Sequence, residues 1–98
     1  MINVSPKAGT FLRQIRTSLP EGSAEKRLVE QLITGSIHML SQAERQSLAD
    51  LCGKTAINGL EVPLHLRREF QVISESIRAF RTQQEVKFRQ RRNRQAEG

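Results

Sequence analysis

Apolar residues recur at intervals of three and four along most of the chain, the spacing that places side chains on one face of an α-helix. The first such stretch is residues 10–19, with Thr10 as its candidate N-cap and Pro20 as its end. The second is residues 23–40, although Gly35 inside it weakens the expectation of one unbroken helix. Strand-like alternation does not occur in the sequence, and the pattern therefore predicts an all-α fold.

Capping signals divide the middle of the chain. Ser23 is a candidate N-cap for the second helix, and Ser41 with Glu44 has the form of a capping box that would open a third. Gly53 lies where a residue with left-handed backbone commonly ends a helix. Residues 54–62 are ambiguous: one turn of helix is an alternative there, and Asn58-Gly59 is a turn signal. The sequence thus predicts three helices followed by a turn.

The last predicted helix begins at Pro63, where a missing N–H costs nothing, and runs to about residue 90. Its first half carries an apolar seam with spacings of four, three, four and three residues: Leu66, Phe70, Ile73, Ile77 and Phe80. We favour the interpretation that this seam closes a bundle of about four helices, because the three earlier helices need a further apolar face to cover them. The alternative is a partner interface, with a second copy of the chain or with another protein.

Positive charge gathers at the end of the same predicted helix. The chain has a net charge of +6, to which residues 1–62 contribute seven cations against six anions and residues 63–98 nine against four. Five cations fall within eight residues: Lys87, Arg89, Arg91, Arg92 and Arg94. A one-ended excess of this kind indicates an anionic partner, with a solvated helix face as the plainer alternative.

Arginine suits nucleic acid because its planar, permanently charged guanidinium can bind a phosphate or a guanine edge through two hydrogen bonds. We therefore assign the five terminal cations as candidate phosphate contacts, which Arg78 and Arg81 would extend along the helix. The absence of Trp and Tyr argues against a stacking platform for single strands. RNA and DNA fit this pattern equally well.

A helix-turn-helix is a weaker alternative for DNA binding. Ala49 and Gly53 have the small-residue and turn spacing of that motif, which would make residues 55–63 the recognition helix. Gly59 lies inside that helix, and few of its side chains suit base or phosphate contacts. An ordinary helix end at Gly53 is therefore favoured.

The sequence predicts no catalytic, metal or cofactor site. The two histidines, His38 and His65, lie 27 residues apart, and with Cys52 they match no compact metal-binding or nucleophile motif. We expect His38 to be partly buried, His65 to be exposed and Cys52 to be a small core residue. The chain is therefore predicted not to be an enzyme.

Length and cysteine content bear on the domain organisation and on the cellular compartment. At 98 residues we expect one helical bundle domain, residues 1–80, followed by an arginine-rich extension, helical or disordered, at residues 81–98. With a single cysteine, and with no signal-peptide pattern or membrane-spanning run in this sequence, we expect a cytoplasmic protein.

Two functions fit these features. The first is a small, non-enzymatic, nucleic-acid-binding regulator whose arginine-rich segment contacts phosphates. The second is an adaptor or inhibitor that docks its basic and apolar last helix on an acidic partner protein. A homodimer is compatible with both. Membrane binding is not expected, because the charged segment has only Val86 and Phe88 to insert.

Overall fold

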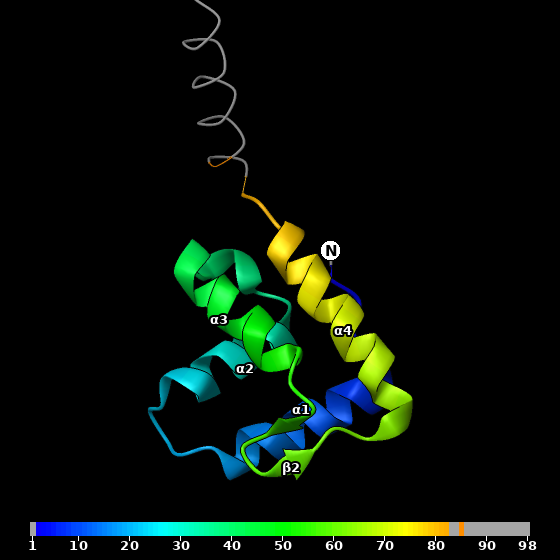
Figure 1. The fold of residues 1–98 in the computed structure, drawn as a ribbon. Helices are drawn as coiled ribbons and strands as arrows, with labels where there is room; N and C mark the ends of the chain where they lie inside the picture. The colour runs from blue at the N-terminus through cyan, green and yellow to red at the C-terminus, as the bar shows by residue number, and fades with distance from the viewer. Residues whose placement is uncertain (1, 83–84, 86–98) are drawn as a thin grey trace, which may run out of the picture.

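The structure is a computed structural model of the chain, and it describes residues 2–82 and 85. Within them the chain forms four α-helices, one turn of 3₁₀ helix and one β-hairpin (Figure 1). In chain order these are α1 (Pro6–Ser18), α2 (Ala24–Thr34), η1 (Ile37–Met39), α3 (Gln42–Cys52), β1 (Ala56–Ile57), β2 (Leu60–Glu61) and α4 (Leu64–Ala79). The prediction of a mainly helical fold is confirmed, and the short hairpin is an addition to it.

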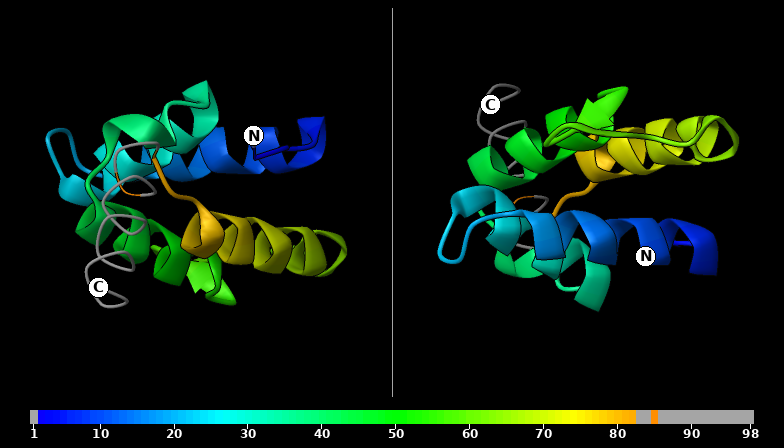
Figure 2. Two further views of the ribbon diagram at one scale, coloured as in Figure 1. Left: turned by 90° about the horizontal axis from the view of Figure 1, so that it is seen from above. Right: turned by 90° about the horizontal axis from the view of Figure 1, so that it is seen from below.

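Helices α3 and α4 run antiparallel, and the hairpin joins them at one end (Figure 1). Seen from above and below, α1 lies on the other side of the core from this pair (Figure 2). An edge-to-face contact between Phe11 of α1 and Phe70 of α4, with ring centroids 5.7 Å apart, links the two sides. Because α3 and α4 are antiparallel, the start of α3 lies close to the end of α4.

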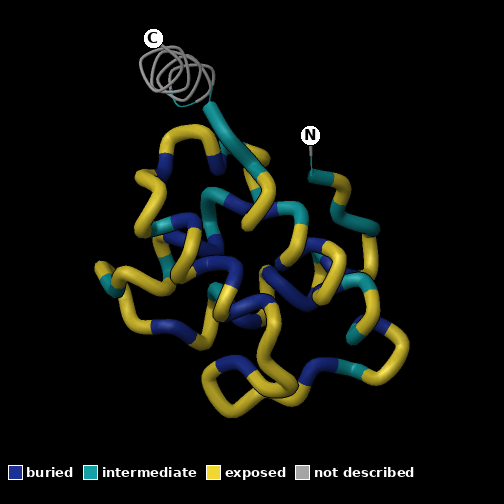
Figure 3. The backbone as a smooth tube through the Cα atoms, turned by 45° about the horizontal axis from the view of Figure 1, so that its top comes forward, coloured by how far each residue is buried: buried dark blue, intermediate teal, exposed yellow. Residues whose placement is uncertain are grey.

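The seam of α4 packs inside the chain. Leu66, Phe70, Ile73 and Ile77 are each at most 4% exposed, whereas Phe80 is partly buried and packs against the core from outside. Buried residues gather toward the middle of the molecule, and most segments at its edge are exposed (Figure 3). These positions agree with the favoured interpretation that the seam closes the bundle. Four of the five candidate partner-interface residues are therefore not on the surface of the folded domain.

The first helix begins earlier than the sequence suggested. Ser5 is its N-cap, since its Oγ accepts from the Ala8 N–H at 3.2 Å, and Pro6 occupies the first helical position. The prediction that Thr10 caps this helix is wrong, because Thr10 Oγ1 donates to the Pro6 carbonyl within the helix. Glu69 of α4 accepts from both the N–H and the hydroxyl of Ser5, at 2.7 and 2.6 Å, and thereby fixes the start of α1 against α4.

The second helix is shorter than predicted. Ser23 caps its start as expected, through a bond from the Lys26 N–H to Ser23 Oγ. Gly35 adopts φ 74° and ψ 23°, a left-handed conformation that ends α2 at Thr34. The expectation of one helix over residues 23–40 is therefore wrong beyond Thr34, where η1 follows instead.

The hairpin replaces the recognition helix that a helix-turn-helix would require. Asn58 and Gly59 both have positive φ, 50° and 80°, which fits the two-residue turn that Asn-Gly favours between antiparallel strands. Asn58 Nδ2 also donates to the Ser18 carbonyl at 3.2 Å and fixes the turn against α1. The expectation of left-handed backbone at Gly53 is wrong, since its φ is −80°. The turn was predicted correctly, and the helix-turn-helix alternative is excluded.

Helix α4 ends before the arginine-rich segment begins. Helix α4 stops at Ala79, and Phe80 has extended backbone with φ −65° and ψ 134°. A single helix running from residue 63 to about residue 90 is therefore not formed, since it is interrupted at Phe80. The five terminal cations lie outside the described residues, and the division at residue 80 stays a prediction.

Candidate functional site at the end of α4

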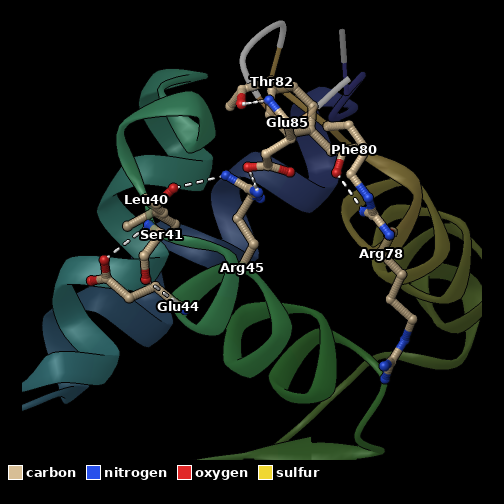
Figure 4. Close-up of polar contacts among 9 residues, drawn as sticks. Leu40, Ser41, Glu44, Arg45, Arg78, Phe80, Thr82 and Glu85 are labelled. Carbon is tan, nitrogen blue, oxygen red and sulfur yellow. Dashed lines mark hydrogen bonds and ion pairs between the residues drawn. The ribbon is translucent and has the colours of Figure 1, made fainter. Parts of the chain in front are cut away.

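The chain leaves the helical bundle beside the first turn of α3. Five residues meet there, and we call this group the junction: Leu40, Arg45, Phe80, Thr82 and Glu85 (Figure 4). The antiparallel course of α3 and α4 positions it, because the start of α3 and the end of α4 lie at one end of the molecule (Figure 1). The junction thus connects the domain to the last part of the chain.

Arg45 is the centre of the junction. The residue is 3% exposed, and its Nη1 donates to the Leu40 carbonyl at 2.8 Å. Its Nη2 forms an ion pair with Glu85, and its guanidinium carbon lies 5.3 Å from the centre of the Phe80 ring. Arginine is rarely buried without a partner, and here Nη1, Nη2 and one face of the guanidinium each have one. Arg45 therefore binds the chain on both sides of Thr82.

Local sequence explains why Arg45 points inward. The capping box between Ser41 and Glu44 starts α3 as predicted, with its two hydrogen bonds at 3.1 and 3.0 Å. In the helix that follows, Arg45 precedes the buried Leu48 and Ala49 by three and four residues, so it lies on the same apolar face. Its aliphatic stem covers apolar surface there while the guanidinium reaches the end of the bundle.

Glu85 is held from two directions. Its N–H donates to Thr82 Oγ1 at 3.3 Å, and its carboxylate pairs with Arg45. The hydrogen bond from Arg45 is the main reason why the pKa of Glu85 is lowered from its ordinary value. The carboxylate is therefore ionised at neutral pH, when its contact with the guanidinium is strongest.

Two of the predicted phosphate contacts lie in the described part of the chain. Arg78 pairs with Asp50 at 2.6 Å on the exposed side of α3 and α4. Arg81 donates to the carbonyls of Arg78 and Phe80, both at 2.7 Å, and forms none of the described ion pairs, although its charge helps to lower the pKa of Glu85. The other five predicted contacts lie outside the described residues: Lys87, Arg89, Arg91, Arg92 and Arg94.

The remaining charge of the domain is nearly balanced. Residues 1–85 hold eleven cations and nine anions, a difference of +2, whereas residues 86–98 hold five cations and one anion, a difference of +4. These two differences make up the net charge of +6. Several cations in the first group are already paired with carboxylates: Lys26, Arg27, Arg45, Arg67 and Arg78. The excess positive charge is therefore concentrated beyond the junction.

The residues weighed for catalysis lie apart. His65 is exposed as expected, but His38 is exposed rather than partly buried. Cys52 is a buried core residue, and burial raises the pKa of its thiol to about 12. Residues 2–82 and 85 contain no group of three metal-ligating side chains, and none of their helices could cross a membrane. The hollow between α2 and α3 includes Glu25, Glu44 and Asp50 in its lining, which does not suit a phosphate.

Comparisons with protein-family models, with curated proteins and with solved structures found no match. The candidate function therefore depends on the chemistry and placement of the chain's own residues. Among these, Arg45 and Glu85 were not predicted as site residues. Two sequence signals pointed to them: a cation on the apolar face of α3, and the spacing of Thr82 and Glu85, which repeats that of Ser41 and Glu44.

Proposed function

We propose that this chain is a small, non-enzymatic, nucleic-acid-binding regulatory protein. In this proposal the helical domain is a scaffold, and the arginine-rich segment, residues 87–94, contacts phosphates. The observation that carries the proposal is the charge distribution: five cations within eight residues, directly after a domain whose own charges nearly balance. A polyanion is the partner that compensates such a segment.

The same five cations set the expected behaviour of the complex. Each phosphate that a cation neutralises releases counterions, so the logarithm of the binding constant falls with the logarithm of salt concentration. For four to six such contacts we expect a slope of about −3 to −5. Arg81 extends the cationic surface toward the domain, whereas Arg78 contributes less because Asp50 compensates its charge.

The burial of the seam favours this proposal over an adaptor that docks on an acidic protein. Such an adaptor would need apolar side chains to supply binding energy beside its basic residues. Phe70, Ile73 and Ile77 are each 1% exposed, so they are already committed to the core. Phe80, which is partly buried, packs against that core and against Arg45.

The proposal is tested with two variants that each lose five positive charges, one in the arginine-rich segment and one in the helical domain. In the segment variant, five cations become Gln: Lys87, Arg89, Arg91, Arg92 and Arg94. In the matched domain variant, five cations that take part in none of the described ion pairs become Gln: Lys7, Arg13, Arg16, Lys54 and Arg68. Affinity for short mixed-sequence RNA and DNA duplexes is then measured for both variants.

We expect the segment variant to lose at least about a hundredfold in affinity at low salt and the domain variant to lose far less. Equal losses would mean that net charge alone attracts nucleic acid, and an unchanged segment variant would contradict the proposal. A chain cut after Glu85 serves as a second test. A cut at Thr82 would be less suitable, because it would also remove the carboxylate that pairs with Arg45.

A further inference from the structure

We propose that Arg45 is a positioning residue for nucleic-acid binding: it anchors the chain at Phe80 and Glu85 and so fixes where the arginine-rich segment starts. This inference rests on the function proposed above. Lys87, the first cation of the segment, follows Glu85 by two residues. Along the sequence, the ion pair at Glu85 is therefore much nearer to this first candidate phosphate contact than the end of α4 at Ala79 is.

The geometry of the anchor is directional. Arg45 Nη1 donates to the Leu40 carbonyl, which precedes α3, and Nη2 pairs with Glu85. In Figure 4 the guanidinium lies between these two acceptors. The two contacts together fix the orientation of the guanidinium. The Phe80 ring packs against the same guanidinium and holds the chain before Thr82. Two contacts of Arg45, with Phe80 and with Glu85, thus hold residues that follow α4, and the contact with Leu40 fixes the guanidinium itself.

Packing alone does not require a charge at this position. An apolar side chain of similar length, such as Met, could cover the same surface of α3, and where both partners of a buried ion pair are replaced by apolar residues the stability is often unchanged. An apolar residue could not, however, donate a hydrogen bond to Glu85. What Arg45 adds to the fold is therefore a specific link to the chain after α4.

The link should increase affinity by preorganisation. A segment attached only at Ala79 would have to order residues 80–85 when it binds, and ordering backbone and side chains opposes association. Because Arg45 already holds Phe80 and Glu85 in the folded protein, fewer residues would lose conformational freedom when the segment binds. Breaking the link leaves the number of cations in the arginine-rich segment unchanged. It should therefore lower the binding constant and leave the dependence of that constant on salt concentration as it is.

The test uses the full chain with the variants Arg45→Met, Glu85→Gln and the double variant. Arg67→Met is the matched control, because it removes the same charge from an exposed ion pair, with Glu61, at the other end of α4. Affinity for mixed-sequence RNA and DNA duplexes is measured across a salt series, well below the unfolding temperature of each variant. Circular dichroism establishes which variants are folded.

We expect Arg45→Met and Glu85→Gln each to weaken binding about three- to tenfold with an unchanged salt slope. The double variant should be no weaker than either single variant, because both remove the same link. Arg67→Met should stay within about twofold of the wild type, and Arg45→Lys, which keeps the charge beside Glu85, should regain part of the loss. Full affinity in a folded Glu85→Gln variant would overturn the inference.

Glu85→Gln keeps the test decisive if Arg45→Met fails to fold, since Glu85 lies outside helices α1 to α4. The two proposals also fail in different ways. If neutralising residues 87–94 leaves binding intact, the proposed function is wrong. If that change abolishes binding while Glu85→Gln and Arg45→Met bind like the wild type, the positioning role alone is wrong.

Discussion

The seam of α4 and the junction beyond it are held by different forces. In the seam, Phe70, Ile73 and Ile77 are buried by apolar contacts, which are strong in sum but have little directional preference. At the junction, Arg45 contacts Leu40 and Glu85 through hydrogen bonds, which fix orientation more than they add stability. The seam thus fixes α4 in the bundle, and the junction fixes Phe80 and Glu85 against Arg45 of α3.

The largest expected effect comes from the seam. Phe70 is 1% exposed and contacts Phe11 edge-to-face, so Phe70→Ala would leave a cavity between α1 and α4. We expect a loss of about 3–5 kcal/mol in the free energy of unfolding, measured by urea denaturation. A loss below about 1 kcal/mol would mean that the seam does not close the bundle.

A smaller loss is expected at the junction. Arg45→Ala removes the partner of the Leu40 carbonyl and the stem that covers α3, while the apolar core stays filled. We expect about 1–3 kcal/mol from the same urea experiment. If Arg45→Ala destabilised the domain as much as Phe70→Ala, the junction would belong to the core and the contrast would disappear.

Acid should weaken the ion pair at the junction and leave the apolar contacts of the seam unchanged. The pKa of Glu85 is lowered, chiefly by its hydrogen bond with Arg45, so the contact is complete above the ordinary value of 4.5 and is lost as pH falls through the lowered pKa. Glu44 behaves likewise, because the Ser41 N–H lowers its pKa. We expect constant stability from about pH 7 to about pH 5 and a decline toward about pH 3.

The control for this profile is Glu85→Gln. It should be less stable than the wild type near neutral pH and should lose less stability in acid, with the urea midpoint at each pH as the readout. Identical pH profiles for the two proteins would show that Glu85 contributes nothing to the acid response.

The smallest effect is expected at the exposed ion pair. The side chains of Arg78 and Asp50 are 44% and 57% exposed, against 4% for Arg45, so water screens their attraction. Arg78→Ala should therefore cost less than about 1 kcal/mol in the urea experiment. A larger loss of stability would mean that burial does not explain a difference in strength between the Arg78–Asp50 and Arg45–Glu85 ion pairs.

Local signals were predicted well from the sequence. The caps at Ser23 and Ser41 and the turn at Asn58-Gly59 follow from residues close together in the chain, and all three are confirmed. The hairpin itself was missed, because strands of two residues are too short to show alternation. The cap at Ser5 was missed although its signal is also local, because Pro6 was taken as a sign of extended chain and not as the first residue of a helix.

The junction shows the limit of sequence reasoning more clearly. Arg45 and Glu85 are 40 residues apart, and no local pattern says which carboxylate meets which guanidinium. The continuation of α4 beyond Phe80 was predicted because residues 81–90 contain no Gly or Pro that would end a helix. Contacts of Phe80 and Glu85 with Arg45, which lies in α3, accompany the extended backbone found at Phe80 instead.

The central claim is that the arginine-rich segment, and not the net charge of the whole chain, binds nucleic acid. The most direct measurement is the salt dependence of duplex binding for the wild type, the segment variant and the domain variant, between about 50 and 200 mM salt. We predict a slope of about −3 to −5 for the wild type, a slope near zero for the segment variant, and a nearly unchanged slope for the domain variant. A segment variant that kept the wild-type slope would contradict the claim.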